Sequence, residues 1–366
     1  MSFLNRSTTS TTSTASAATG QELANDITVN NAPEDSISDL SFSPTQDLLA
    51  AASWDKKVRI YEIDANSGQN QGRALYEHEG PVFSAQWSLD GQRVISGGAD
   101  KQVKIFDLAS QQQQQIGIHD APVKSVRYVE CGPTNTQVVV SASWDKTLKY
   151  WDTRSPQPIS TITLPERAYT MDASQKLLVV GCADRHLAII DLNNPQQIFK
   201  TSISPLKWQT RVVSCYPQGN GFAIGSIEGR CAFQYIDDSE QNKFGFSFRC
   251  HRKTPNNTTS ALRSSSESHI YAVNDIVFHP VYGTFSTAGS DGTFCYWDKD
   301  ARQRLKSFPE LNCSITTTAF NKTGNIFAYA LSYDWAQGHQ GNRSDYPTQI
   351  KLHATNDNEI KQKKKR

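Results

Sequence analysis

The sequence predicts an all-β protein built as a seven-bladed β-propeller, and two observations carry the prediction. The segments AASWDKKVRIYE, SGGADKQVKIFD and SASWDKTLKYWD each place an acidic turn before a basic and aromatic strand, and their aspartates Asp55, Asp100 and Asp145 are 45 residues apart. Weaker copies continue the series, so that acidic turn residues fall at 55, 100, 145, 184, 228, 291 and 334. Internal repeats of about 40 to 45 residues are typical of propeller blades.

Each repeat is predicted to form one four-stranded antiparallel blade. Segments such as PVFSAQW (81–87) alternate apolar and polar residues, as half-buried strands do. A polar turn, for example at 88–91, leads to a second apolar strand, which the acidic turn and the basic-aromatic strand follow. One such sheet cannot bury both of its faces. Packing side by side around an axis buries them, and closure of the ring protects the sheet edges.

The two ends of the chain differ from the repeats. Residues 1–21 are rich in Ser and Thr, and we expect them to be disordered. The propeller is predicted to span 22–355, and 356–366 is predicted to be a polar, basic tail. Because this tail is too polar to supply the last outer strand, we expect NDITVNN (25–31) to complete the blade built from 312–355.

Composition excludes several classes of protein. The formal net charge is +1, so no global field favours nucleic acid or lipid, and any basic site must be local. Seven cysteines without a C-x-x-C pair argue against a disulfide framework and a zinc knuckle, and we expect no metal or cofactor. No apolar run suits a secretory signal or a membrane span, which predicts an intracellular, soluble protein.

Histidines near the acidic turns raise the question of catalysis. His78 and His119 stand just before the first strands of their repeats, where each can bond to a turn aspartate. With Ser96 or Ser141 nearby, the set resembles a catalytic triad. A catalytic set is needed once, whereas this set recurs with the repeat, so we interpret it as structural and predict no enzymatic activity. Cys250-His251 is interpreted as a core thiol beside a surface imidazole.

Aromatic residues mixed with cations indicate candidate contact surfaces. Trp54 and Trp144 precede turn aspartates and are expected to project from loops, as contact anchors or as packing against the next blade. In YWDKDARQRLK (296–306), several cations follow Trp297, a combination that suits an acidic peptide or single-stranded nucleic acid. A solvated loop is the alternative for each segment. The secondary candidates, from LPERAYTMD and SPLKWQTR, are Arg167, Lys207, Trp208 and Arg211.

The strands ending in YWD and IFD after an acidic turn resemble the WD-repeat family, over residues 25–355. More narrowly, EDSISDLSFSP, LPERAYTMD, LKWQTR, SIEGR, FSFRCHR, GSDGTFCYWDKDAR and NIFAYALSYDWAQGH, in this order, resemble the WD-repeat mRNA export factors of the nuclear pore, the Rae/Gle family, and a fungal member in particular. The resemblance implies a non-enzymatic adaptor in poly(A) mRNA export. It also implies two partners, a GLEBS-type segment of an FG-repeat nucleoporin and single-stranded RNA, with no membrane insertion and no small-molecule substrate.

The resemblance also implies a location and a set of site residues. The location is the nucleus, at the nuclear pore complex and the nuclear rim, with some protein in the cytoplasm. The alternative is a WD-repeat scaffold in a mitotic checkpoint or ubiquitin-ligase assembly. Lys299 and Arg302 are expected to be exposed cations that rim an apolar slot beside Phe248. The residues that the resemblance implies for partner or RNA binding are Arg230, Phe248, Trp297, Asp298, Lys299, Arg302 and Lys306.

Overall fold

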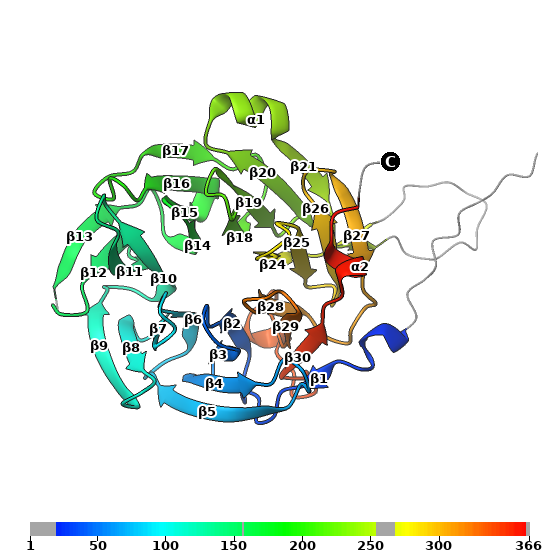
Figure 1. The fold of residues 1–366 in the computed structure, drawn as a ribbon. Helices are drawn as coiled ribbons and strands as arrows, with labels where there is room; N and C mark the ends of the chain where they lie inside the picture. Colours follow the sequence, from blue (N-terminus) through cyan, green and yellow to red (C-terminus); the bar gives the residue numbers. More distant parts are fainter. Residues whose placement is uncertain (1–19, 156, 254–267, 364–366) are drawn as a thin grey trace, which may run out of the picture.

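The structure, a computed structural model, describes residues 20–155, 157–253 and 268–363. Within these ranges the strands form seven four-stranded antiparallel sheets and one two-stranded sheet. The seven larger sheets are arranged as blades around a common axis (Figure 1). The predicted all-β, seven-bladed propeller is therefore confirmed.

Blades 1 to 4 follow one another along the chain, each with its innermost strand first. Blade 1 contains β2 (Ile37–Phe42), β3 (Leu48–Ser53), β4 (Lys57–Ile63) and β5 (Asn70–Glu77). Blade 2 contains β6 (Val82–Trp87), β7 (Arg93–Gly98), β8 (Gln102–Asp107) and β9 (Gln112–Ile118). Blade 3 contains β10 (Val123–Cys131), β11 (Thr136–Ser143), β12 (Thr147–Trp151) and β13 (Pro158–Thr163). Blade 4 contains β14 (Ala168–Ser174), β15 (Leu177–Cys182), β16 (His186–Asp191) and β17 (Lys200–Ile203), with the short 3-10 helix η2 (Ala183–Arg185) before β16.

Blades 5 to 7 carry the insertions. Blade 5 contains β18 (Thr210–Cys215), β19 (Gly221–Ser226), β20 (Arg230–Tyr235) and β21 (Phe246–Arg249), with helix α1 (Asp238–Phe244) between the last two strands. A small ribbon of β22 (Arg252–Lys253) and β23 (His269–Ile270) follows. Blade 6 contains β24 (Val273–Phe278), β25 (Phe285–Gly289), β26 (Phe294–Asp298) and β27 (Gln303–Ser307). Blade 7 contains β28 (Ile315–Phe320), β29 (Ile326–Leu331), β30 (Gln349–Ala354) and β1 (Ile27–Thr28), with the 3-10 helix η3 (His339–Gly341) before β30.

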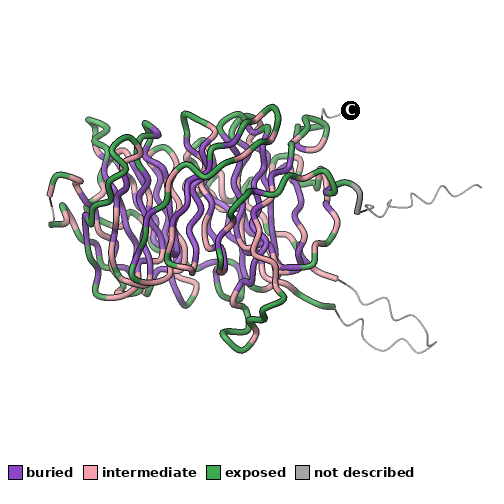
Figure 2. The backbone as a smooth tube through the Cα atoms, turned by 90° about the horizontal axis from the view of Figure 1, so that it is seen from below, coloured by how far each residue is buried: buried purple, intermediate pink, exposed green. Residues whose placement is uncertain are grey.

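The core lies between blades rather than in one central cluster. The second strand of a blade is covered on both faces, and all six residues of β3 and of β29 are buried. One cluster joins Leu49 and Ala51 of blade 1 to Ala328 and Ile350 of blade 7. Buried strand segments accordingly fill the middle of the molecule, and exposed segments lie mainly in the turns at its two ends (Figure 2). The face-to-face packing of sheets explains why the central strands are continuous apolar runs.

The N-terminal segment closes the ring. In blade 7, β1 pairs antiparallel with β30, with Ile27 opposite Leu352. The strand is shorter than the predicted 25–31, but the pairing extends beyond it because the Val29 amide donates to the Ile350 carbonyl at 2.9 Å. Val29 is buried in the cluster between blades 7 and 1. The N-terminal strand β1 and the last strands of the chain therefore belong to one sheet.

A ring of inter-blade hydrogen bonds lines the central axis. The Asp39 carboxylate accepts from the Ala85 amide of blade 2 at 3.1 Å, and Asp275 of blade 6 accepts from the Thr318 amide of blade 7 at 2.6 Å. At the seam, Thr317 of blade 7 accepts from the Leu40 amide of blade 1 at 3.2 Å. Burial raises the pKa of Asp275 to about 6. These axial carboxylates therefore act in blade-to-blade cohesion.

Part of the C-terminal segment forms a short helix. Residues 356–366 were expected to form a polar tail, but α2 (Asp357–Ile360) packs against blade 6 beside β27 (Figure 1). Ile360 is buried in one cluster with Leu23 of the 3-10 helix η1 (Gly20–Leu23). The buried Ile360, a capping box between Asn356 and Glu359, and hydrogen bonds that link Glu359 to His353 and Asp357 to Tyr282 hold the segment. The expected disorder of 1–21 lies outside the described residues except for 20 and 21, which belong to η1.

Candidate functional site

The histidines near the acidic turns form buried networks within the propeller. His78 Nδ1 lies 2.8 Å from the Asp100 carboxylate and His78 Nε2 lies 2.7 Å from the Ser96 hydroxyl. The Tyr76 hydroxyl also donates to Ser96, at 2.8 Å. The same arrangement recurs with distances of 2.8 Å for His119–Asp145 and 2.7 Å for His119–Ser141. The serine hydroxyls are engaged with buried aromatic side chains, which supports the structural interpretation of these sets.

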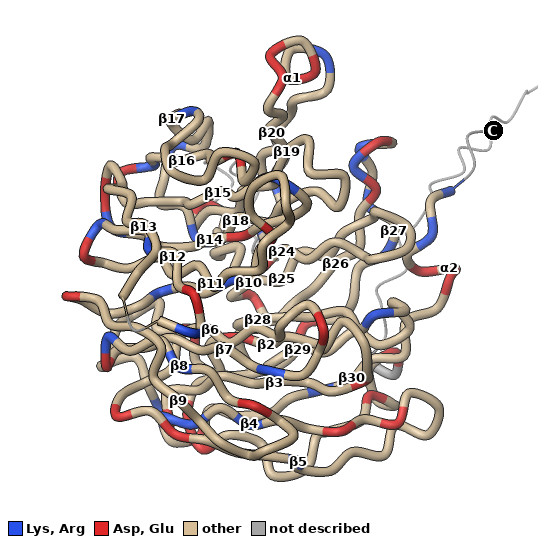
Figure 3. Tube along the Cα trace, turned by 60° about the vertical axis from the view of Figure 1, so that its left-hand side comes forward, with Lys and Arg blue, Asp and Glu red and all other residues tan. Residues whose placement is uncertain are grey.

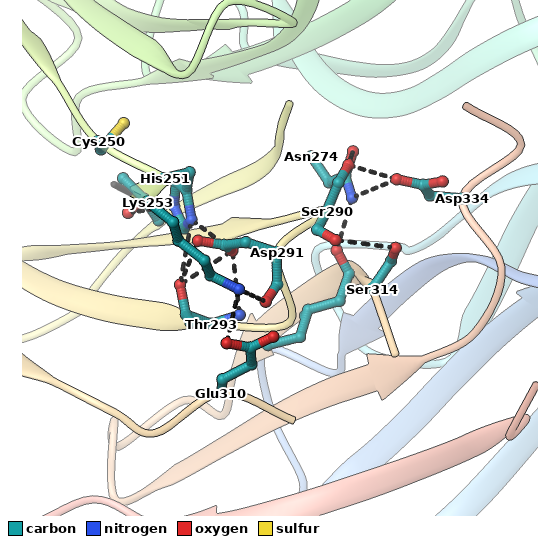
Figure 4. A network of polar contacts seen from close by, with 12 residues as sticks. Cys250, His251, Lys253, Asn274, Ser290, Asp291, Thr293, Glu310, Ser314 and Asp334 are labelled. Atoms are coloured by element: carbon teal, nitrogen blue, oxygen red, sulfur yellow. Dashed lines mark hydrogen bonds and ion pairs between the residues drawn. The ribbon is translucent and has the colours of Figure 1, made fainter. Parts of the chain in front are cut away.

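A third network contradicts one sequence-based interpretation. His251, predicted to be a surface imidazole, is buried. Its Nδ1 lies 2.9 Å from Asp291 (Figure 4). Its Nε2 lies 3.0 Å from the Thr287 hydroxyl. The Trp297 indole N–H donates to the same hydroxyl at 2.9 Å. Trp297 therefore belongs to the internal network of blade 6 as well as to the candidate surface.

Trp297 and Phe248 meet where blades 5 and 6 adjoin. Trp297 is near the end of β26, Phe248 is on β21, and their ring centroids are 4.7 Å apart. The turn that follows Trp297 is rigid because the buried Asp298 carboxylate accepts from the amides of Asp300 and Ala301 at 2.9 and 3.1 Å. Asp298 thus shapes the turn instead of presenting a free carboxylate.

Four arginines lie on or beside the elements that carry this aromatic pair. Arg302 lies over Phe246, 4.8 Å from its ring centroid, and Arg304 lies over Trp297 at 5.9 Å. Arg230 on β20 is opposite Arg249 on β21. Among the described residues, no Asp or Glu carboxylate lies within 4.0 Å of the side-chain nitrogens of these four arginines. We call Phe248, Trp297 and the four arginines the basic-aromatic surface.

Two predicted lysines have a different role. Lys299 was expected to be exposed, but its side chain is only 12% exposed. Its ammonium group lies 5.5 Å from the Tyr216 ring centroid of blade 5 and 2.6 Å from the Asp300 carboxylate. The expectation is wrong because the aliphatic stem packs across the boundary between the blades. Lys306 pairs with Glu22 of η1 at 2.8 Å, so its charge is balanced within the chain.

Two aromatic residues beside the basic-aromatic surface were not predicted from the sequence. Phe246 lies beside Phe248 on β21, and Phe244 ends α1 with 43% of its surface exposed. The Arg302 guanidinium donates to the Phe244 carbonyl at 3.4 Å. The signal was the alternation FGFSFR, in which aromatic residues recur on one face of an outer strand and a cation follows.

Most secondary candidates lie on the opposite face of the ring. Successive strands alternate in direction, so the turns that carry Trp54 and the entries to the first strands share one end, and the turn after Trp297 is at the other. There, a pocket of about 420 Å³ opens at the central axis. Its lining includes Trp54, Trp144, Trp335, Arg167 and Arg211. We call it the axial pocket.

Aromatic stacking shapes the axial pocket. Trp54 stacks on Trp335 with ring centroids 4.0 Å apart, and Phe83 lies 5.4 Å from Trp54 and 5.7 Å from Trp144. The sequence left two roles open for Trp54 and Trp144: contact anchors, or packing against the next blade. In the structure the two indoles pack against other aromatic rings and also line the pocket. Burial lowers the pKa of Lys124, in the same lining, to about 8.

The remaining secondary candidates lie beside this pocket. Trp208 is 62% exposed in the loop before β18, and Lys207 is also exposed. Neither is in the pocket lining, whereas their neighbours Gln209 and Arg211 are. The loop can therefore extend the contact area of the axial pocket.

Over the described residues, neither the charge distribution nor the metal-ligating side chains point to a metal centre. Basic and acidic segments are interspersed around the ring, in agreement with the net charge of +1 (Figure 3). Within residues 20–155, 157–253 and 268–363, no group of three or more His, Cys, Asp or Glu side chains is placed to hold a metal ion. None of the described helices has the length and apolar character needed to cross a membrane.

The repeats, the closed ring of seven blades and the buried His–Asp networks define a WD-repeat β-propeller. A family model described as "WD domain, G-beta repeat" matches residues 26–62, 69–107, 110–152 and 261–298.

Similar proteins narrow the class. The chain is 55% identical over 355 residues to "mRNA export factor GLE2" of Chaetomium thermophilum, covering 96% of each chain. It is 52% identical over 356 residues to "Poly(A)+ RNA export protein" of Schizosaccharomyces pombe, covering 97% of each chain. It is 47% identical over 323 residues to "Protein Rae1" of Drosophila melanogaster, covering 86% of this chain and 90% of the relative. The chain belongs to the WD-repeat mRNA export factors of the Rae/Gle family.

Proposed function

We propose that the protein is a non-enzymatic adaptor for poly(A) mRNA export at the nuclear pore. In this proposal the basic-aromatic surface binds single-stranded RNA, and the axial pocket receives a GLEBS-type segment of an FG-repeat nucleoporin. The names of the fungal relatives support the role in mRNA export. The proposed location is the nucleus, chiefly the nuclear pore complex and the nuclear rim, with a cytoplasmic fraction.

The unpaired arginines beside Phe248 and Trp297 carry the RNA part of the proposal. In a chain with balanced charge, four arginines without a described carboxylate partner lie on adjoining elements of blades 5 and 6, where they can pair with an anionic ligand. Aromatic side chains supply faces on which unpaired bases stack, at about 1 to 3 kcal/mol per base. Cations and aromatic rings together suit single-stranded RNA, in which each nucleotide carries a base and a phosphate.

The axial pocket supports binding of the second partner on the other face. Its arc of tryptophans offers apolar surface, and Arg167, Arg211 and Lys124 offer charge for acidic residues of a peptide. Tryptophan and arginine are the residues that most often dominate protein interfaces. Because Trp297, Arg302 and Arg304 lie at the end of the strands opposite the axial pocket, RNA bound there leaves the pocket free for the nucleoporin segment.

Salt dependence of RNA affinity tests the proposal. Each protein–phosphate contact contributes a slope of about −0.7 to a plot of log affinity against log salt for a single strand. We expect Arg304→Glu to weaken oligo(A) binding and to reduce the magnitude of the slope by about 0.7, the contribution of one phosphate contact. The matched control is Arg73→Glu, an exposed arginine on the outer strand of blade 1.

Three outcomes are informative. A reduced slope in Arg304→Glu and an unchanged slope in Arg73→Glu support the site. Equal slopes in the wild type, Arg304→Glu and Arg73→Glu contradict the proposed RNA site. A reduced slope in Lys207→Glu alone would move the RNA site to the face that carries the axial pocket.

A further inference from the structure

The basic-aromatic surface continues from blade 6 onto the insertion helix of blade 5. We propose that Phe246, covered by Arg302, and the exposed Phe244 form a second base-stacking station, so that the ligand is a run of several unpaired nucleotides. This inference rests on the proposed RNA binding. It extends the site beyond the residues that the family resemblance implied and assigns a role to α1.

The aromatic rings form a continuous series along β21. Phe246 and Phe248 are 6.2 Å apart with planes inclined by 27°, and Phe248 contacts Trp297 at 4.7 Å. Phe246 is supported from below by the buried Phe233, whose ring is 4.8 Å away and inclined by 4°. Rings held in this way are pre-organised, so a base can stack without ordering the protein first.

Arg302 forms the outer layer of the station. Its guanidinium lies 4.8 Å from the Phe246 centroid and is held by the hydrogen bond to the Phe244 carbonyl. The residue has a positive φ of 53°, which fixes the turn that aims the side chain at blade 5. A guanidinium plane is itself a platform for a base. Arg302 thus acts by stacking in addition to its charge.

Phe244 is presented by a helix with defined anchors. The Asp237 side chain caps the start of α1, and the Gln241 side-chain oxygen accepts from the Tyr235 amide at 2.7 Å. The Phe244 ring is 5.9 Å from that of Tyr235 and still 43% exposed. The Lys243 ammonium lies 4.9 Å from the same ring. An apolar ring with an adjacent cation is therefore held open to solvent.

The repetition of ring and cation favours nucleic acid over protein as the ligand. Arg304 accompanies Trp297, Arg302 accompanies Phe246, and Lys243 accompanies Phe244. Among the described residues, none of these three cations pairs with a carboxylate within 4.0 Å. A nucleic acid strand offers one flat base and one negative charge in every nucleotide, which matches this repeated pairing of a ring with a cation. An acidic peptide with a single apolar side chain would occupy only one such pair.

The test compares oligo(A) of increasing length on the full chain. For the wild-type protein, we expect affinity to rise again after the length that fills the Phe248–Trp297 station. Phe244→Ala should remove that second rise and weaken binding of the longer oligonucleotides at least about fivefold, the lower range for one stacked base. The salt slope should be unchanged because phenylalanine carries no charge. Phe244→Trp should restore affinity.

Two further variants sharpen the result. Arg302→Lys keeps the charge but loses the planar group, so it should weaken binding while preserving the salt slope. Phe199→Ala removes a phenylalanine that is 61% exposed next to β17 and is the matched control, with no expected effect. Thermal melting of each variant verifies the fold.

The outcomes separate this inference from the proposed function. If the folded Phe244→Ala protein binds long oligonucleotides as the wild type does while Arg304→Glu still reduces the slope, the second station is wrong and the RNA site stands. If the wild type binds no oligonucleotide, both proposals fail. If Phe244→Ala instead weakens only an acidic peptide that carries one apolar residue, the station is a protein site and the inference is overturned.

Discussion

Deprotonation of His353 should open the junction where the propeller ring closes. His353 on β30 is buried, with Nδ1 2.8 Å from Asp26 and Nε2 3.3 Å from Glu359. Asp26 precedes the closing strand β1, and Glu359 belongs to α2. A charged imidazole therefore ties together the N-terminal segment, the last blade and the C-terminal helix.

The size of the effect follows from the pKa of His353. Burial alone lowers this pKa, but the hydrogen bonds to Asp26 and Glu359 outweigh burial and raise the pKa from 6.5 to about 9. Because the folded-state pKa is the higher one, the stabilisation is fully present below about pH 6.5 and is lost as pH rises through 9. At 1.36 kcal/mol per pKa unit, the contribution is about 3 kcal/mol.

Urea unfolding at several pH values between 6 and 9.5 measures this contribution. We expect the free energy of unfolding of the wild type to fall by about 3 kcal/mol more than that of His353→Gln, whose amide cannot be protonated in this range. The control is His339→Gln in the exposed η3, which should follow the wild type. A constant difference between wild type and His353→Gln from pH 6 to 9.5 would refute the charged junction.

Two further predictions concern the scaffold. Asp100→Ala should lower the free energy of unfolding by ~1 to 3 kcal/mol, because His78 and the Glu79 amide lose their buried acceptor; chemical denaturation measures the loss, and an unchanged midpoint would contradict the network. Deleting residues 1–32 removes β1, so the edge of β30 becomes exposed and the protein should melt at a lower temperature and aggregate. Deleting 1–19 should change neither property, and equal melting temperatures for both deletions would be incompatible with closure by β1.

The sequence predicted the two His–Asp networks whose spacing follows the repeat. It did not predict the third, in which the histidine and the aspartate are further apart in the chain. His78 and His119 precede their aspartates by 22 and 26 residues, so both belong visibly to the pattern. His251 precedes Asp291 by 40 residues because the insertion between β22 and β23 separates them. The bond is the same in all three blades. Its sequence signal disappears when a loop lengthens, because the fold conserves distance in space and not along the chain.

By itself, the sequence determined the seven-fold repeat, the all-β class and the closing role of the N-terminal segment. These properties depend on local alternation, turn residues and polarity, which neighbouring residues show directly. Only the tertiary structure decided which cations of the YWDKDAR stretch remain available. Lys299 is covered by Tyr216 of another blade, and Lys306 pairs with Glu22, 284 residues away. Exposure and charge balance depend on partners that ring closure brings together, and no local pattern contains them.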